Sequence, residues 1–224
     1  MRRWGFTLLF LALTPIFVSC GDDDDEKKKE EPATCDVAAQ TGCEDGQVCE
    51  TVAGAEPKCF APVSVKGKVF DTTTQAGIEG AHVVARDANE GAVSGIAVSA
   101  KDGTYELRVP SPRDADGKPV KTEYTLRADA MGYLTFPKAP RVALPVDIAT
   151  ATGDPWVVQS SATDIGLIPL PSTANLGSVS GKVLAENPGG TLVVAGGLTG
   201  TAGTDGAYTV FNVPAGSVGV SGYL

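Results

Sequence analysis

Histidine is nearly absent from this chain: among 224 residues there is one, His82. A lone histidine acts in catalysis only when a nucleophile or a carboxylate lies beside it, and the sequence contains no G-x-S-x-G motif that could supply a serine. The C-x-x-C spacing of zinc and thiol-redox sites is also missing. His82 alternates with Ala81 and Val83, so we expect a surface histidine in a chain that is not an enzyme and carries no cofactor or metal.

Positive charge is scarce as well. The chain has 18 lysines and arginines against 27 acidic residues, a formal net charge of −9. Nucleic acid and anionic lipid headgroups would repel such a chain, so neither is an expected partner.

Long apolar runs are missing except near the amino terminus. Arg2 and Arg3 are followed by residues 6–18, which are apolar but for Thr7, Thr14 and Pro15. The run is too short to cross a bilayer as a helix, but it has the length of a signal-peptide core. We therefore assign residues 1–19 to a signal peptide.

The residues that follow resemble the lipobox of bacterial lipoproteins. In "FVSC" small or apolar residues precede Cys20, although Phe17 stands where leucine is usual. The resemblance implies cleavage between Ser19 and Cys20, a diacylglycerol thioether on the Cys20 sulfur, and anchorage to a membrane by several fatty chains. Gly21 stands where an inner-membrane retention signal would place aspartate, which favours the outer membrane, on its periplasmic or cell-surface side.

Residues 21–34 are too polar to form a core, with four aspartates, three glutamates and three lysines. With Cys20 they are expected to form a solvated tether, residues 20–34. The next segment, residues 35–60, contains Cys35, Cys43, Cys49 and Cys59. An exported chain meets an oxidising compartment, so two disulfides are expected, with three connectivities open. These cross-links must supply the order that so small a module cannot gain from a core.

From residue 63 onward short alternating segments predict an all-β fold, because no sustained 3.6-residue period occurs. Three landmarks also repeat in order: "VKGKVF" as "VSGKVL", "KDGTYELRVP" as "TDGAYTVFNVP", and "MGYL" as "SGYL". The repeats predict two tandem β-sandwiches, residues 61–171 and 177–224, joined by a linker at 172–176. The second lacks a counterpart of "TDIGLIPLP" at 163–171, so we expect either a fragment or an edge open to another strand.

These landmarks resemble carboxypeptidase regulatory-like domains, which are transthyretin-like β-sandwiches. The second-strand pattern of that family is filled by Ile78, Gly80, Ala81, Val83 and Ala85. The resemblance implies accessory domains of peptidases, transporters or surface proteins, with no shared catalytic residues.

Local chemistry gives three further expectations for the repeats. Gly103 and Gly206 each follow an aspartate and suit tight turns at positive φ. Tyr105 falls in phase with the apolar positions of its strand and is expected between the sheets. In the second repeat the apolar Val213 comes one residue late, which predicts a β-bulge near residues 211–212.

Two segments resemble ligand-binding motifs but lack residues that those motifs require. "GSVSGKV" at 177–183 has one residue too few between its glycines for a phosphate loop, and Val183 stands where serine or threonine is needed. "DADG" at 114–117 lacks the later ligands of a calcium loop and is expected to be a polar turn.

Together these features predict an anchored, non-catalytic lipoprotein of the cell surface that serves display, adhesion or the binding of protein or glycan. The alternative is the accessory stalk of a secreted enzyme, such as a metallo-carboxypeptidase, with its catalytic domain beyond residue 224. The reading frame after codon 224 distinguishes the two.

Overall fold

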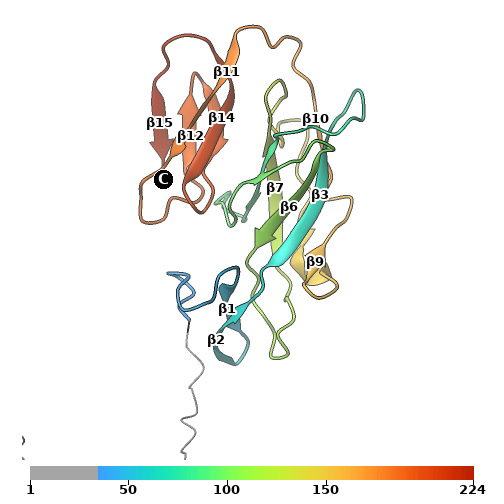
Figure 1. Ribbon diagram of the computed structural model, residues 1–224, viewed down its shortest axis with the longest axis vertical. Helices are drawn as coiled ribbons and strands as arrows, with labels where there is room; N and C mark the ends of the chain where they lie inside the picture. The colour runs from blue at the N-terminus through green and yellow to red at the C-terminus, as the bar shows by residue number, and fades with distance from the viewer. Residues whose placement is uncertain (1–34) are drawn as a thin grey trace, which may run out of the picture. The chain divides into compact units, whose positions relative to one another are not determined.

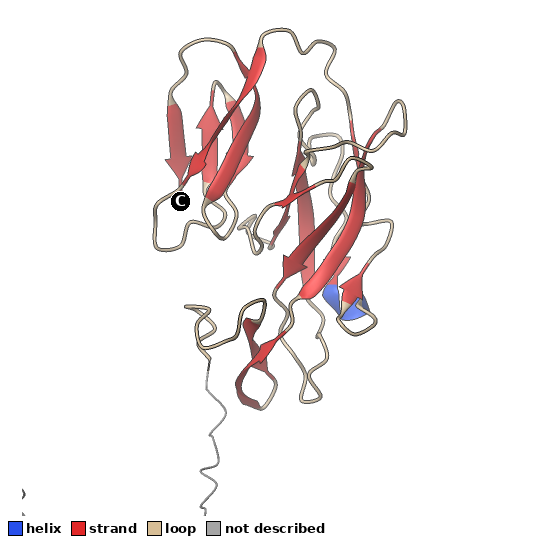
Figure 2. Cartoon of the chain, viewed as in Figure 1, coloured by secondary structure: helices blue, strands red, loops and turns tan. Residues whose placement is uncertain are grey.

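The computed structural model describes residues 35–224, which belong to one compact unit. The expectations for the signal peptide, for cleavage and lipidation at Ser19 and Cys20, and for the tether fall outside these residues. The predicted all-β class is confirmed: the described chain forms fifteen strands and a single 3-10 turn, η1 (Ile148–Thr150) (Figures 1 and 2). Within residues 35–224, no helix has the length and apolar character needed to cross a membrane.

The first element is an antiparallel hairpin of β1 (Val48–Val52) and β2 (Ala55–Phe60). Two disulfides cross-link it to the segment before it, Cys35–Cys49 and Cys43–Cys59. The expectation of two disulfides is confirmed, and of the three connectivities the structure shows this interleaved one.

Two larger sheets follow and share a core. The first sheet has the order β10-β3-β6, with β9 also paired to β3, and the second has the order β5-β4-β7-β8. Their strands are β3 (Val63–Asp71), β4 (His82–Arg86), β5 (Ala97–Val98), β6 (Thr104–Val109), β7 (Glu123–Asp129), β8 (Val146–Asp147), β9 (Val157–Val158) and β10 (Ile165–Leu167). Alternate residues of β6 and β7 face inward, as the period-two pattern predicts, and join a cluster of twenty buried apolar residues.

Tyr105 lies in this core, as predicted, with 5% of its surface exposed. Its hydroxyl donates a hydrogen bond of 2.6 Å to the carbonyl of Thr163, just before β10. Burial raises the pKa of Tyr105 well above its usual range. Gly67 lies opposite Tyr105 in the register of β3 and β6, and a Cβ there would lie 2.1 Å from the Thr163 oxygen. A glycine is therefore required for β3, Tyr105 and Thr163 to approach one another.

The remaining strands form two smaller sheets, of orders β11-β14 and β13-β12-β15. They are β11 (Leu176–Lys182), β12 (Leu192–Ala195), β13 (Leu198–Thr201), β14 (Ala207–Pro214) and β15 (Val220–Tyr223). Gly181 faces Tyr208 as Gly67 faces Tyr105, so the first two sequence landmarks are structurally equivalent. The third is not: "MGYL" follows β7 as a turn, whereas most of "SGYL" lies within β15. The reason is a loop of only five residues between β14 and β15, which brings "SGYL" into the strand.

Both turn glycines and the bulge are confirmed. Gly103 and Gly206 have φ of +85° and +80°. Four residues of β14, from Val210 to Val213, lie opposite three residues of β11, from Gly177 to Val179, which places one extra residue at 211–212. At the bulge Asn212 has φ +61°.

The bulge connects the smaller sheets to the larger ones. The Asn212 side chain accepts a hydrogen bond of 2.7 Å from the Gly132 amide and donates to the carbonyls of Ala130 and Tyr133 at 3.1 and 2.9 Å. One side chain thus satisfies three backbone groups of the turn that follows β7.

The two glycines opposite the tyrosines allow a matched test. Gly67→Ala should lower the free energy of unfolding by about 3 kcal/mol, because the new methyl group meets backbone atoms that cannot move away. Gly181→Ala should cost less than about 1 kcal/mol, since its Cβ meets only the mobile end of the Tyr208 side chain, 2.6 Å away at the hydroxyl. Urea unfolding of both variants measures the difference, and equal losses would contradict the assignment.

Candidate functional site

Three arginines are buried among the described residues, and their surroundings differ. Arg86, Arg113 and Arg127 expose 6%, 1% and 6% of their surfaces. A buried guanidinium is costly unless acceptors surround it, so the partners of each arginine indicate what it does.

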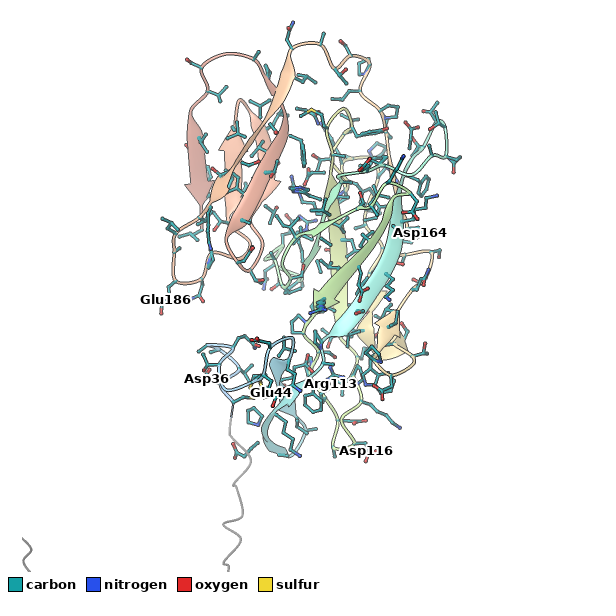
Figure 3. All side chains as sticks on the ribbon, in the orientation of Figure 1. Asp36, Glu44, Arg113, Asp116, Asp164 and Glu186 are labelled. Carbon is teal, nitrogen blue, oxygen red and sulfur yellow. A yellow bond between two sulfur atoms is a disulfide. The ribbon has the colours of Figure 1, made fainter. Side chains whose placement is uncertain are left out.

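Arg113 joins the disulfide-linked hairpin to the larger sheets. Its Nε donates to a carboxylate oxygen of Glu50 on β1, its Nη2 donates to the Ala61 carbonyl at 3.1 Å, and its guanidinium lies 4.8 Å from the centre of the Phe60 ring. The second oxygen of Glu50 accepts from the Ser111 amide at 2.7 Å. Burial raises the pKa of the Glu50 carboxyl, and the hydrogen bonds from Arg113 and Ser111 oppose that shift. Figure 3 shows Arg113 beside the hairpin, near the turn that carries Asp116.

Arg127 makes a comparable connection on the outer face of β7. Its Nε and Nη2 donate to the two oxygens of Asp129 at 2.7 and 3.1 Å, a bidentate pair. The same Nη2 donates to the backbone carbonyl of Thr199 on β13 at 2.8 Å, and Asp129 also accepts from the hydroxyl of Thr135 at 2.6 Å. Arg127 therefore holds the sheet of β12, β13 and β15 against the outer face of β7.

Arg86 is the exception. It lies on the outer face of β4, opposite Thr125 of β7. The one hydrogen bond of its side chain within residues 35–224 runs from Nη1 to Glu90 and is 3.4 Å long, and 78% of the Glu90 side chain is exposed. The Nε of Arg86 is buried without a partner among the described residues. This guanidinium is as buried as that of Arg127 but has far fewer acceptors.

Two hollows meet at Arg86. The first, which we name the proline groove, has a volume of about 440 Å³ and is lined by Arg86, Asp87, Ala88, Glu90, Thr125 and the segment 137–143. The second, of about 410 Å³, shares Arg86 and Glu90 with the first and is also lined by Arg127, Asn187, residues 189–192 and Thr201. The incompletely bonded arginine thus contributes to the lining of both hollows, although only 6% of its surface is exposed.

His82 is half-buried, so the surface position that the alternation suggests holds only in part. It does point away from the first core, but Phe211 of the bulge covers it, with ring centroids 4.9 Å apart and edge-to-face geometry. Its Nδ1 is buried without a partner in the described chain, and burial lowers the pKa of the imidazole. The sequence did not indicate this cover, because alternation identifies which face of a strand a residue occupies but not what packs on that face.

The four cysteines lie close together. The sulfur atoms of Cys35, Cys43 and Cys49 lie within 4.8 Å of one another, a distance that would suit a metal. All three are in disulfides, whereas the ligand form of cysteine is the thiolate.

Both rejected motifs have the structures expected of them. Residues 177–182 belong to β11, so the apparent phosphate loop is a strand. At the "DADG" segment the Asp114 carboxylate accepts from the amides of Asp116 and Lys118 at 2.9 and 2.8 Å, which closes a polar turn.

No family model matches the chain, and no curated protein matches it significantly. Sequence reasoning did not single out the arginines. For Arg86 and Arg127 the one signal available was their position on predicted strands, where a charged residue on an outward face is expected to be solvent-exposed; Arg113 lies between strands.

The clamp between Arg113 and Glu50 can be tested by removing one charge. Glu50→Gln should lower the free energy of unfolding by about 3–5 kcal/mol, because it leaves a buried guanidinium without its counter-charge. The double variant Glu50→Leu with Arg113→Met should recover most of that loss.

The control is the exposed pair of Lys121 and Glu123, 3.3 Å apart, with 72% and 49% of the two side chains exposed. Glu123→Gln should change the stability by less than about 1 kcal/mol. Chemical denaturation compares the variants, and a Glu50→Gln loss as small as that of Glu123→Gln would exclude a structural role for the clamp.

Proposed function

We propose that this protein is a lipid-anchored, non-catalytic module of the bacterial cell envelope whose β-rich body binds another molecule. The observation that carries the proposal is the pair of hollows at Arg86, both of which are lined in part by this buried cation with incomplete pairing. Binding sites are typically concave and contain a few placed polar groups within a largely apolar lining.

The rigidity of the body supports a binding role. Two disulfides, the clamp of Arg113 on Glu50, and Asn212 at the bulge connect its parts. A site on connected strands keeps its geometry without a ligand, which lowers the entropic cost of binding.

The surroundings of the possible catalytic groups point the same way. The ring of His82 is packed under Phe211, and the four cysteines of the described chain form disulfides rather than free thiols. The resemblance to carboxypeptidase regulatory-like domains, whose members are accessory modules, agrees with binding or display. Anchorage at Cys20 is supported by the lipobox-like "FVSC", and Gly21 after it favours the outer membrane.

The anchor is tested by metabolic labelling with radioactive palmitate in a bacterial host. The unmodified chain should be labelled and cleaved before Cys20, and Cys20→Ala should abolish both. Ser19→Ala is the matched control, because alanine keeps a small residue before the cysteine and should retain the label. Label that persists in Cys20→Ala would show that the lipid is not on this residue.

A further inference from the structure

We propose that the proline groove binds a carboxylate of an acidic, partly aliphatic peptide, and that the Arg86 guanidinium is the group that recognises it. This inference rests on the proposed binding function and names the ligand class for that site. The observation behind it is a guanidinium that is more than nine-tenths buried, lines the groove and is poorly paired.

The missing acceptors define the ligand. Arginine presents donors in a planar fork that matches the two oxygens of a carboxylate. In Arg127 the fork is filled by Asp129, at 2.7 and 3.1 Å. In Arg86 no carboxylate lies across the fork within residues 35–224, and one long bond to Glu90 takes part of its place. A ligand carboxylate would pair with the guanidinium donors of Arg86 as the Asp129 carboxylate pairs with those of Arg127.

The other charges of the groove favour an anion. Lys138 is exposed on the wall and forms no ion pair within the described residues. Asp87 is engaged in its own turn, where one oxygen accepts from the amides of Asn89 and Gly91 at 2.8 and 2.9 Å. Among residues 35–224, Glu90 is the acidic side chain that bonds to Arg86, while Asp129 acts on it without a bond. Most of the Glu90 side chain is in solvent, so a ligand can displace it.

The apolar wall favours a peptide over a sugar acid. It consists of Pro137, Ala139, Pro140, Val142 and Ala143, and Val142 is 75% exposed. Aliphatic side chains of a peptide gain free energy by covering such a wall, whereas the hydroxyl groups of a sugar would lose their water contacts against it.

The experiment is a calorimetric titration of the full chain in detergent with the peptide acetyl-Val-Ala-Glu-Ala-Val-amide. The matched peptide with glutamine in place of glutamate should bind at least about tenfold more weakly, because hydrogen bonds to charged groups exceed those to neutral ones by about this factor. Arg86→Gln should weaken binding of the glutamate peptide by about tenfold or more and leave the glutamine peptide unaffected. Arg108→Gln, a change of an exposed arginine on β6, is the control and should have no effect.

Glu90→Gln keeps the proposal testable if Arg86→Gln does not fold. Removal of the internal competitor should tighten binding of the glutamate peptide by several-fold, on the order of 0.5–1 kcal/mol. Equal binding of the two peptides, an unchanged affinity in Arg86→Gln, or binding of glucuronate in place of the peptide would each overturn the proposal. Palmitate labelling does not depend on any of these titrations, so the proposal of a lipid anchor and the proposal of a peptide ligand can be refuted separately.

Discussion

A buried arginine needs acceptors for its hydrogen-bond donors and a partner for its charge. The parts of residues 35–224 are connected where two buried arginines find both. Arg113 meets this need through Glu50 and the carbonyl of Ala61, and so connects the disulfide-linked hairpin to the larger sheets. Arg127 meets it through Asp129 and the carbonyl of Thr199, and so connects β7 to β13. Hydrophobic packing alone would hold these parts weakly, because the smaller sheets share a cluster of only four buried apolar residues.

Arg86 departs from this pattern, and the departure suggests function. A protein gains no stability from a buried cation with one long bond to an exposed glutamate, so a structural explanation is weak for this residue. The departure occurs beside a groove with an aliphatic wall and an exposed lysine. In a preorganised recognition site, some hydrogen-bond donors are expected to lack partners in the free protein and to gain them from the ligand.

Much of the fold could be predicted because it follows from local rules. Alternation identified the strands around Tyr105, the aspartate–glycine pairs identified the turns at Gly103 and Gly206, and the late Val213 identified the bulge. The third repeat landmark failed because loop length, rather than the motif, determines whether "SGYL" lies in a strand or after one.

The candidate site could not be predicted, because it depends on contacts between segments distant in sequence. Nothing near His82 in the sequence indicates that Phe211 covers it. Likewise, nothing local separates Arg86 from Arg127, since both lie on outward faces of neighbouring strands. The difference between them arises from an aspartate two residues from Arg127 and a threonine carbonyl 72 residues away, neither of which Arg86 has.

The most direct measurement is NMR of the arginine Nε–H groups in the full chain, with and without the glutamate peptide. The account predicts that the Arg86 signal shifts and exchanges more slowly with water when the peptide is bound, because its donors gain a carboxylate. The signals of Arg113 and Arg127 should stay unchanged, since their acceptors are already in place. A bound peptide that leaves the Arg86 signal unmoved, or that moves the other two instead, would contradict the account.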